Sequence, residues 1–435
     1  MRASRAAWLV AVVAAVPAAR AADDWPRMRG PDGGGAGGDV RIPAEWDDAR
    51  WAWTVRLPGA GHASPIVFAG GIYTASADEA AKMRFVSRHR LDTGALDWQR
   101  ELPGAIDPHH AQNSSASGTL AAGPLGVYWL WADHDGLRAE AFGHDGRPLW
   151  HADIGPYEGE HGFGASPAVW RDLLIVPNDQ LGESGVLALD AATGAVRWRR
   201  PRGSAKSGFS TPLVIEGDDG RTTGAQRRPQ VVLASMAHGI FGLDAATGGV
   251  MWERACLPKR SVSCPVIVGP GDRPLGSLLV VATCGDGGGD NSLVALHAPA
   301  NDMQAAVTSE VYQPEIAYQI DRGAAPYVPT PLPHGERLYL WGDRGVVTCV
   351  SAATGEVRWR GRVGGTFSAS PIVVGDTILN VEAGGEVVTL AAGDVFEVRG
   401  RRPLGEECRS TPAVAGRRVV FRSLTRLYAI DGAID

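Results

Sequence analysis

A short motif that returns along the chain constrains its fold more than any other feature. It reads Leu-Asp-Ala-Ala-Thr-Gly-x-Val-x-Trp at residues 189–198 and with small changes at 243–252, 91–98 and 350–359, while a weaker copy lies at 143–150. An Asp side chain accepts hydrogen bonds from amides two residues on, and Gly adopts a positive φ. Each copy therefore predicts a strand, a tight turn and a second strand, with Val and Trp on one strand face.

The Asp, Gly and Trp of this motif are the expected framework of the repeat, because Trp is large enough to fill the gap between neighbouring twisted sheets. The framework residues are Trp53, Asp92, Gly94, Trp98, Trp150, Asp190, Gly194, Trp198, Asp244, Gly248, Trp252, Gly355 and Trp359.

A second motif marks where each repeat begins. Ser or Thr precedes Pro at six points, Cys264 takes that place in one repeat, and residues 116–118 fill the remaining slot. Pro lacks a donor for the strand ladder and suits the first residue of a strand. Eight openings, each followed by two hairpins, predict eight four-stranded antiparallel blades.

The two ends of the chain complement each other. After Thr411 only three strands remain, whereas residues 51–55 match a closing Trp strand with no opening before it. We therefore predict an all-β, eight-bladed β-propeller whose last blade is closed by the N-terminal strand, which leaves no exposed sheet edge there.

The N-terminus predicts export. Arg2 and Arg5 precede an apolar run at 8–16 that is too short for a bilayer, and residues 19–21 form a small-x-small cleavage site. We expect a Sec-type signal peptide at 1–21 without a lipid-bearing Cys, and a periplasmic or secreted protein. No later run is apolar enough to predict a transmembrane segment.

The mature chain divides into two parts. Residues 22–46 form a Trp-Pro and Gly-rich segment, and residues 47–435 form the propeller. The Gly run at 33–38 is typical of a flexible linker. Trp25 is expected to dock on the propeller, or alternatively to reach a partner.

Charge and cysteine content limit the function further. The formal net charge of -6 disfavours nucleic-acid binding, which needs clustered Lys and Arg. Five Cys in an oxidising compartment leave at least one thiol unpaired. Cys264 and Cys284 could face each other in a hairpin and form a disulfide, with Cys256 as a competitor. No Cys pair has the spacing of a zinc or redox site.

The loops just before the openings should line one mouth of the central channel. This candidate binding funnel contains His62, His109, His110, Asn113, His161, Lys206, Arg260, Tyr327 and Arg409. Such a ring could bind an anion or a sugar, although polar loop residues also simply bond to backbone and water. His62, His110 and His161 would suit a transition metal only if the three separate blades that carry them bring their side chains together. We predict neither a metal site nor catalytic residues, because no nucleophile elbow, Walker loop or dinucleotide-binding fingerprint appears in its required context.

The recurrent Asp-x-x-Thr-Gly-x-x-x-Trp unit resembles the PQQ-type (quinoprotein-like) β-propeller repeat. Trp-Pro-Arg-Met-Arg-Gly-Pro at 25–31 resembles an exported subgroup that begins with Trp-Pro-x-x-Arg-Gly-Pro, similar to BamB-like propellers. For the enzymes of this fold, the resemblance implies PQQ held with calcium beneath a vicinal Cys pair. This chain has no adjacent cysteines.

We therefore expect an exported, monomeric, non-catalytic propeller, without a cofactor, that binds a protein, peptide or polysaccharide of the cell envelope. One alternative is a PQQ-dependent oxidoreductase, which an acidic and amide calcium cluster would favour. A second alternative is a carbohydrate-active enzyme using the funnel, which two close carboxylates would favour.

Overall fold

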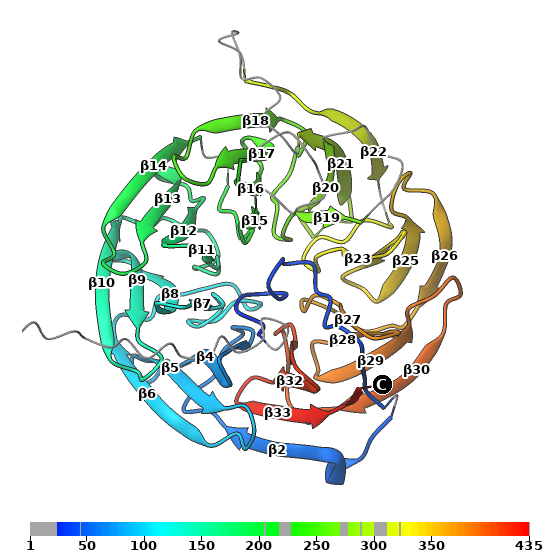
Figure 1. The fold of residues 1–435 in the computed structure, drawn as a ribbon, viewed down its shortest axis with the longest axis horizontal. Helices are drawn as coiled ribbons and strands as arrows, with labels where there is room; N and C mark the ends of the chain where they lie inside the picture. The colour runs from blue at the N-terminus through cyan, green and yellow to red at the C-terminus, as the bar shows by residue number, and fades with distance from the viewer. Residues whose placement is uncertain are drawn as a thin grey trace, which may run out of the picture.

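The strands form a closed ring of eight sheets. The computed structural model describes residues 24–43, 45–203, 206–216, 228–269, 277–287, 289–299, 311–321 and 323–434. Each main sheet has four antiparallel strands, and the sheets surround one axis (Figure 1). The predicted eight-bladed propeller is confirmed. The expected signal peptide at 1–21 lies outside the described residues.

Blades one to seven each run in chain order from the innermost to the outermost strand. Blades one to four contain β3 (Ile66–Phe68), β4 (Gly71–Asp78), β5 (Met83–Arg90), β6 (Leu96–Pro103), β7 (Ala121–Gly123), β8 (Gly126–Asp133), β9 (Gly136–Phe142), β10 (Pro148–Gly155), β11 (Ala168–Trp170), β12 (Leu173–Asn178), β13 (Ser184–Asp190), β14 (Val196–Arg202), β15 (Leu213–Ile215), β16 (Gln230–Ser235), β17 (Gly239–Asp244) and β18 (Val250–Arg254). Blades five to seven contain β19 (Val266–Val268), β20 (Ser277–Cys284), β21 (Ser292–Pro299), β22 (Glu315–Asp321), β23 (Leu332–His334), β24 (Arg337–Trp341), β25 (Val346–Ser351), β26 (Val357–Arg362), β27 (Ile372–Val374), β28 (Thr377–Val381), β29 (Glu386–Ala391) and β30 (Val398–Pro403).

Blade eight joins the two ends of the chain, as predicted. Its inner strands are β31 (Ala413–Ala415), β32 (Arg418–Arg422) and β33 (Arg426–Asp431), and β2 (Trp51–Arg56) pairs antiparallel with β33 as the outer strand. A short 3₁₀ turn, η2 (Asp48–Arg50), precedes β2, and β1 (Val40–Arg41) pairs with β34 (Ala433–Ile434). Within the described part of the chain, no helix is long or apolar enough to cross a membrane.

The opening residues bond neighbouring blades together next to the axis. The amide of Thr411 donates to the hydroxyl of Ser64, and the amide of Ser64 donates to Thr119 Oγ1. Each of these hydrogen bonds is 3.0 Å long. Cys264 brings no hydroxyl, but its amide still donates to Thr330 Oγ1 at 3.1 Å. In blade two this position is filled by Thr119, not by residues 116–118 as predicted, because Thr119 supplies the hydroxyl that the contact needs.

The repeat motif builds the predicted turn and also the contact between successive blades. Asp190 Oδ1 accepts hydrogen bonds from the amides of Ala192 and Thr193 at 3.1 and 3.0 Å. The indole of Trp198 lies against Gly248 of the next blade, where a Cβ would come within 2.5 Å of the ring. Gly248 has a φ of +68°, so both its conformation and the space beside it require glycine.

The same Trp-on-Gly contact recurs around the ring. The Trp of one blade covers the turn Gly of the next in the pairs Trp53–Gly94, Trp98–Gly146 and Trp150–Gly194, and Tyr318 takes the place of Trp over Gly355. The predicted role of the Trp in filling the gap between sheets is confirmed at these positions. Trp252 differs, because its Nε1 donates to Gln230 Oε1 of its own blade.

The prediction that Val and Trp share one strand face is wrong. Val196 is 54% exposed, whereas Trp198 is 9% exposed. The register of β13 and β14 shifts between these residues, since Leu189 lies opposite Val196 and its neighbour Ala188 lies opposite Trp198. This β-bulge inserts one residue and turns Val196 to solvent while Trp198 stays buried.

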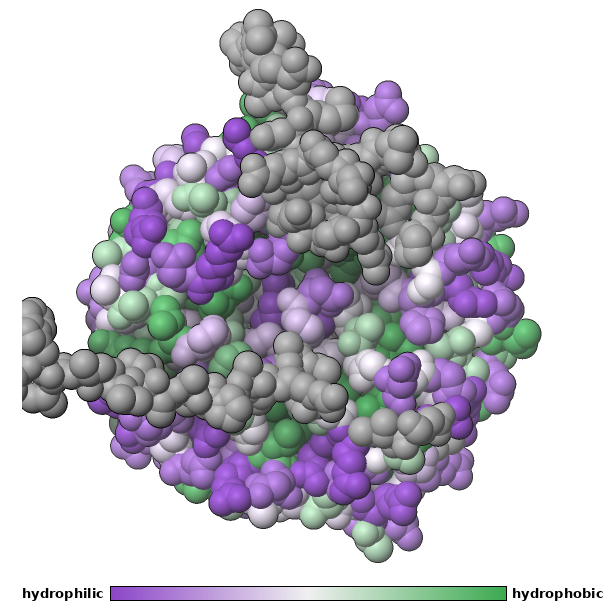
Figure 2. Space-filling view, in the orientation of Figure 1, coloured by the Kyte–Doolittle hydropathy of each residue, from purple (hydrophilic) through white to green (hydrophobic). Residues whose placement is uncertain are grey.

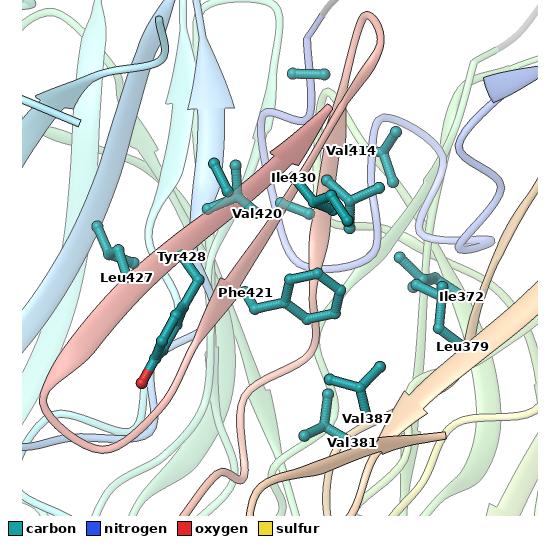
Figure 3. Packing of buried hydrophobic residues seen from close by; sticks show 14 of the residues in the cluster. Ile372, Leu379, Val381, Val387, Val414, Val420, Phe421, Leu427, Tyr428 and Ile430 are labelled. Carbon is teal, nitrogen blue, oxygen red and sulfur yellow. The ribbon is translucent and has the colours of Figure 1, made fainter. Parts of the chain in front are cut away.

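The apolar core lies between blades rather than at the axis. Figure 3 shows one such layer, where Ile372 and Leu379 of blade seven face Val414, Val420 and Phe421 of blade eight. These side chains are almost wholly buried. Burial on both faces explains why the inner strands are nearly continuous runs of apolar residues.

The five cysteines are all free thiols, so the Cys264–Cys284 disulfide that the sequence left possible is absent from the structure. Val266 of β19 lies opposite Val281 of β20, which puts Thr283 rather than Cys284 across from Cys264. Neighbouring residues of a strand point to opposite faces, and Cys284 Sγ lies 3.2 Å from Ser292 Oγ instead.

Replacing Trp198 by Ala should destabilise the propeller by about 3–5 kcal/mol, because it leaves a cavity between blades three and four. Urea unfolding of the purified protein measures the change. The matched control is Val196→Ala on the same strand, which should change the free energy of unfolding by less than about 0.5 kcal/mol. Equal losses in both variants would contradict the assigned strand faces.

Candidate functional site

The N-terminal segment, residues 24–43, enters the central channel. Figure 1 shows it in dark blue across the middle of the ring. Trp25 and Val67 of β3 exchange two backbone hydrogen bonds of 2.8 Å, and Ala122 of β7 donates to the carbonyl of Pro26. The expected docking of Trp25 on the propeller is therefore confirmed.

Two buried arginines fix this segment to the inner strands. Arg29 is 1% exposed and donates to the carbonyls of Pro371 at 2.6 Å and Pro331 at 3.0 Å. Arg27 donates to the carbonyl of Pro212 at 2.5 Å. The two guanidinium groups thus bond to carbonyls that lie immediately before the inner strands of blades four, six and seven. Burial lowers the pKa of Arg29 to about 10, so it remains charged at neutral pH.

The Gly run that was interpreted as a flexible linker is part of this packing. The amide of Gly37 donates to the carbonyl of Val373 at 2.8 Å. A Cβ on Gly37 would come within 2.6 Å of Val414. The prediction of a linker fails because glycine here allows close contact with the channel wall, which composition alone does not distinguish from flexibility.

The segment closes the channel from the face that carries the Asp-x-x-Thr-Gly turns, which we call the turn face. The opposite face carries the loops that join one blade to the next, and we call it the loop face. On the loop face lies a funnel of about 920 Å³ that has Met28 among its lining residues. Beyond Met28 the N-terminal segment bonds to residues at the inner strands of blades one, two, four, six and seven. Among the described residues, the funnel is therefore a blind cavity with one mouth.

The structure brings together seven of the nine candidate binding residues. The funnel is lined by His62, His110, Asn113, His161, Arg260, Tyr327 and Arg409. His109 lines a smaller neighbouring cavity of about 400 Å³ and bonds to Glu79 at 2.9 Å. Lys206 is exposed and is not a lining residue of the funnel.

Several charged lining residues were missed from the sequence. Arg344 and Asp343 lie in the turn between β24 and β25, and Arg360 and Arg362 lie on β26. The turn between β24 and β25 lies on the loop face, as the interblade loops do. Strand direction could therefore have indicated that Asp343 and Arg344 line the funnel. Arg362 had no comparable signal, because an outer strand is expected to face away from the axis.

The electrostatics of the funnel are dominated by arginine. Arg260 is 9% exposed and pairs with Glu160, while Arg409 Nε pairs with Glu407 at 2.9 Å. Burial, followed by the nearby charges of Arg422 and Arg409, lowers the pKa of His62 to about 3. His62 is therefore neutral at physiological pH, and arginine supplies the fixed positive charge.

The funnel does not fit a calcium-bound PQQ. Calcium favours several carboxylate and carbonyl oxygens as ligands. The two carboxylates that line the funnel already have partners. Asp286 Oδ2 lies 2.8 Å from Lys259 Nζ. Asp343 accepts hydrogen bonds from the amides of Tyr327 and Val328. Among the described residues, no three His, Cys, Asp or Glu side chains are grouped to hold a metal ion. We assign no catalytic step through this cofactor.

Fold and site together define a β-propeller of the PQQ-type repeat class with one blind, arginine-lined funnel. More particularly, the chain belongs to the family described as outer membrane protein assembly factor BamB, whose model matches residues 136–287 and 315–433. A relative from Xanthomonas campestris pv. campestris, named outer membrane protein assembly factor BamB, is 29% identical over 157 residues. That match covers 34% of this chain and 33% of the relative, so the chain spans only about a third of the relative's length.

Solved structures share the fold at low sequence identity. BamB from Moraxella catarrhalis has a TM-score of 0.58 and 16% identity, over 88% of this chain and 97% of that one. Quinohemoprotein alcohol dehydrogenase from Comamonas testosteroni has a TM-score of 0.63 and 14% identity, over 94% of this chain and 80% of that one. The architecture is therefore shared by a BamB protein and an alcohol dehydrogenase, and it does not determine function.

Replacing Arg29 by Met should lower the free energy of unfolding by about 3 kcal/mol, because hydrogen bonds from a charged donor contribute roughly 1.5–3 kcal/mol each. The variant keeps an unbranched side chain that can pack in the same place, but it loses both contacts with blades six and seven. Arg56→Met, on the exposed edge of β2, is the control and should be nearly neutral. Equal stability of all three proteins in urea would show that the segment is not held by Arg29.

Asp179, half-buried in the turn between β12 and β13, should make stability depend on pH. Desolvation raises its pKa to about 7, so the folded state binds a proton more tightly than the unfolded chain. The contribution of Asp179 to stability should then be most favourable near pH 4 and fall as pH rises to about 7, where the carboxyl also ionises in the folded protein. Asp179→Asn should add on the order of 1–3 kcal/mol at pH 8 and nearly nothing at pH 4. A gain of the same size at both pH values in urea unfolding would contradict this.

Proposed function

We propose that this chain is a non-catalytic, protein-binding component of the cell envelope that acts in the assembly of outer-membrane proteins. The observation that carries the proposal is the blind funnel on the loop face, which offers one concave binding surface among loops on a rigid ring. Loops positioned by a rigid scaffold are the usual site of recognition. Membership of the BamB family supports the choice of a protein as the partner.

The envelope location is part of the same proposal. The relatives named as BamB are described as outer membrane assembly factors, and the apolar N-terminal run supports export. We propose a mature protein that begins near residue 22, so that the N-terminal segment becomes the new chain end.

Deleting the gene should lower the abundance of β-barrel proteins in the outer membrane, measured by quantitative proteomics of isolated membranes. A photo-crosslinking amino acid at position 344, at the funnel, should capture an assembly protein in living cells. The control position is Thr193 in a turn on the opposite face, where no such adduct should form. Unchanged β-barrel proteins together with no adduct from position 344 would reject this role.

The same proposal expects no binding of PQQ. Thermal unfolding of the mature protein should show no shift in melting temperature when PQQ is added with or without calcium, and the absorbance of PQQ should not change. A ligand that binds only the folded state raises the melting temperature, and the rise continues with the logarithm of the ligand concentration above the dissociation constant. Such a rise together with a spectral change would instead favour a PQQ-dependent oxidoreductase.

A further inference from the structure

We propose that the funnel binds an acidic loop or chain end of the protein partner, with aspartate and glutamate side chains held by the arginines of blade six. This inference rests on the proposed function, since it names the chemistry of the segment that the funnel receives.

The charges of the funnel wall are unbalanced. Five arginines line it, at positions 260, 344, 360, 362 and 409, against two aspartates, at positions 286 and 343. Both aspartates already accept hydrogen bonds from neighbouring donors. The wall therefore carries an excess of positive charge although the whole chain has a formal net charge of -6.

Blade six contributes the lining arginines that form no ion pair with a described carboxylate. Arg344 and Arg362 are exposed and form no ion pair with any described residue, and Arg360 donates to the carbonyl of Gly323 at 2.6 Å. Arginine forms two parallel hydrogen bonds to a carboxylate, so such side chains suit acidic groups. Elsewhere on the wall, Arg260 and Arg409 already pair with Glu160 and Glu407.

Deeper in the funnel the polar groups are suited to a peptide backbone. The side-chain oxygen Oδ1 of Asn291 and Nδ1 of His62 are buried without a hydrogen-bond partner, and so is Nε of Arg260. A buried polar group without a partner costs free energy that a ligand can recover. The lining also includes Phe209 and Phe367, so donors, acceptors and apolar surface are all present, as a peptide requires.

The closed end of the funnel limits how the partner enters. Because Met28 lies at its inner end, a strand cannot pass through the ring, and the ligand must enter and leave by one mouth. A volume of about 920 Å³ is within the range of pockets that enclose most of a small ligand. These conditions fit a loop or a chain terminus and not a long strand or a double helix.

The test is fluorescence anisotropy with the mature protein and a short fluorescein-labelled peptide that alternates Asp with Gly. We expect saturable binding that weakens with added salt, since exposed charges are screened. An otherwise identical peptide that alternates Asn with Gly should bind at least about tenfold more weakly, because it lacks carboxylates.

Arg344→Glu combined with Arg362→Glu should weaken binding of the acidic peptide at least about tenfold. The matched control is Arg50→Glu combined with Arg56→Glu, two exposed arginines beside β2 whose replacement changes the net charge equally. The control should stay within about twofold of the unchanged protein. Equal thermal unfolding of the three proteins checks that each is folded.

Three results would overturn the inference: equal binding of both peptides, equal losses in both double variants, or tighter binding of a single-stranded oligonucleotide. The last would assign the funnel to nucleic acid. If the acidic peptide fails to bind while position 344 still crosslinks an assembly protein in cells, the acidic-ligand inference fails and the proposed function stands.

Discussion

The contact between a closing aromatic side chain and the turn glycine of the next blade is the interaction on which the ring depends. Each such contact joins two sheets that share no strand hydrogen bonds. Trp198 also donates its indole N–H to the carbonyl of Ala245 in the next blade at 3.1 Å, so the aromatic ring is held at its polar edge as well as its faces. A second set of contacts, between the opening hydroxyls and amides, fixes the same blades near the axis. The apolar layers between blades are thus held by the aromatic–glycine contacts on the outside and by the hydroxyl–amide hydrogen bonds near the axis.

The N-terminal segment converts this ring into a cavity. Without it, a propeller axis is a channel with two openings. Arg27 and Arg29 place positive charge inside the ring but bond it to carbonyls, so that charge is compensated within the protein. The arginines of blade six differ because they face the funnel without a carboxylate. The same residue type therefore serves two purposes, one in holding the chain and one in presenting charge to a ligand.

The sequence was sufficient to predict the architecture because residues within each repeat specify its turns and the starts of its strands. Asp190 and Gly194 define a turn, Pro marks the start of an inner strand, and the unpaired strand at 51–55 fits the incomplete last blade. The failures have a common origin in contacts between residues far apart in the chain. A bulge reverses the face of Val196, and the tight approach of Gly37 to Val414 looks like a linker in composition. The candidate site was predicted where it depends on loops before the openings, whereas Arg362 reaches the funnel from an outer strand.

The pairing of β2 with β33 has a consequence for how the chain reaches its folded state. A chain is synthesised from its N-terminus, yet the partner of β2 is β33, which follows it by seven blades. Trp51 and Trp53 must therefore wait until β33 has been made, and pairings between such distant segments form slowly. An unpaired strand edge is prone to pair with other chains. The interval before closure is thus the period in which the newly made protein is most exposed to aggregation and most in need of a chaperone.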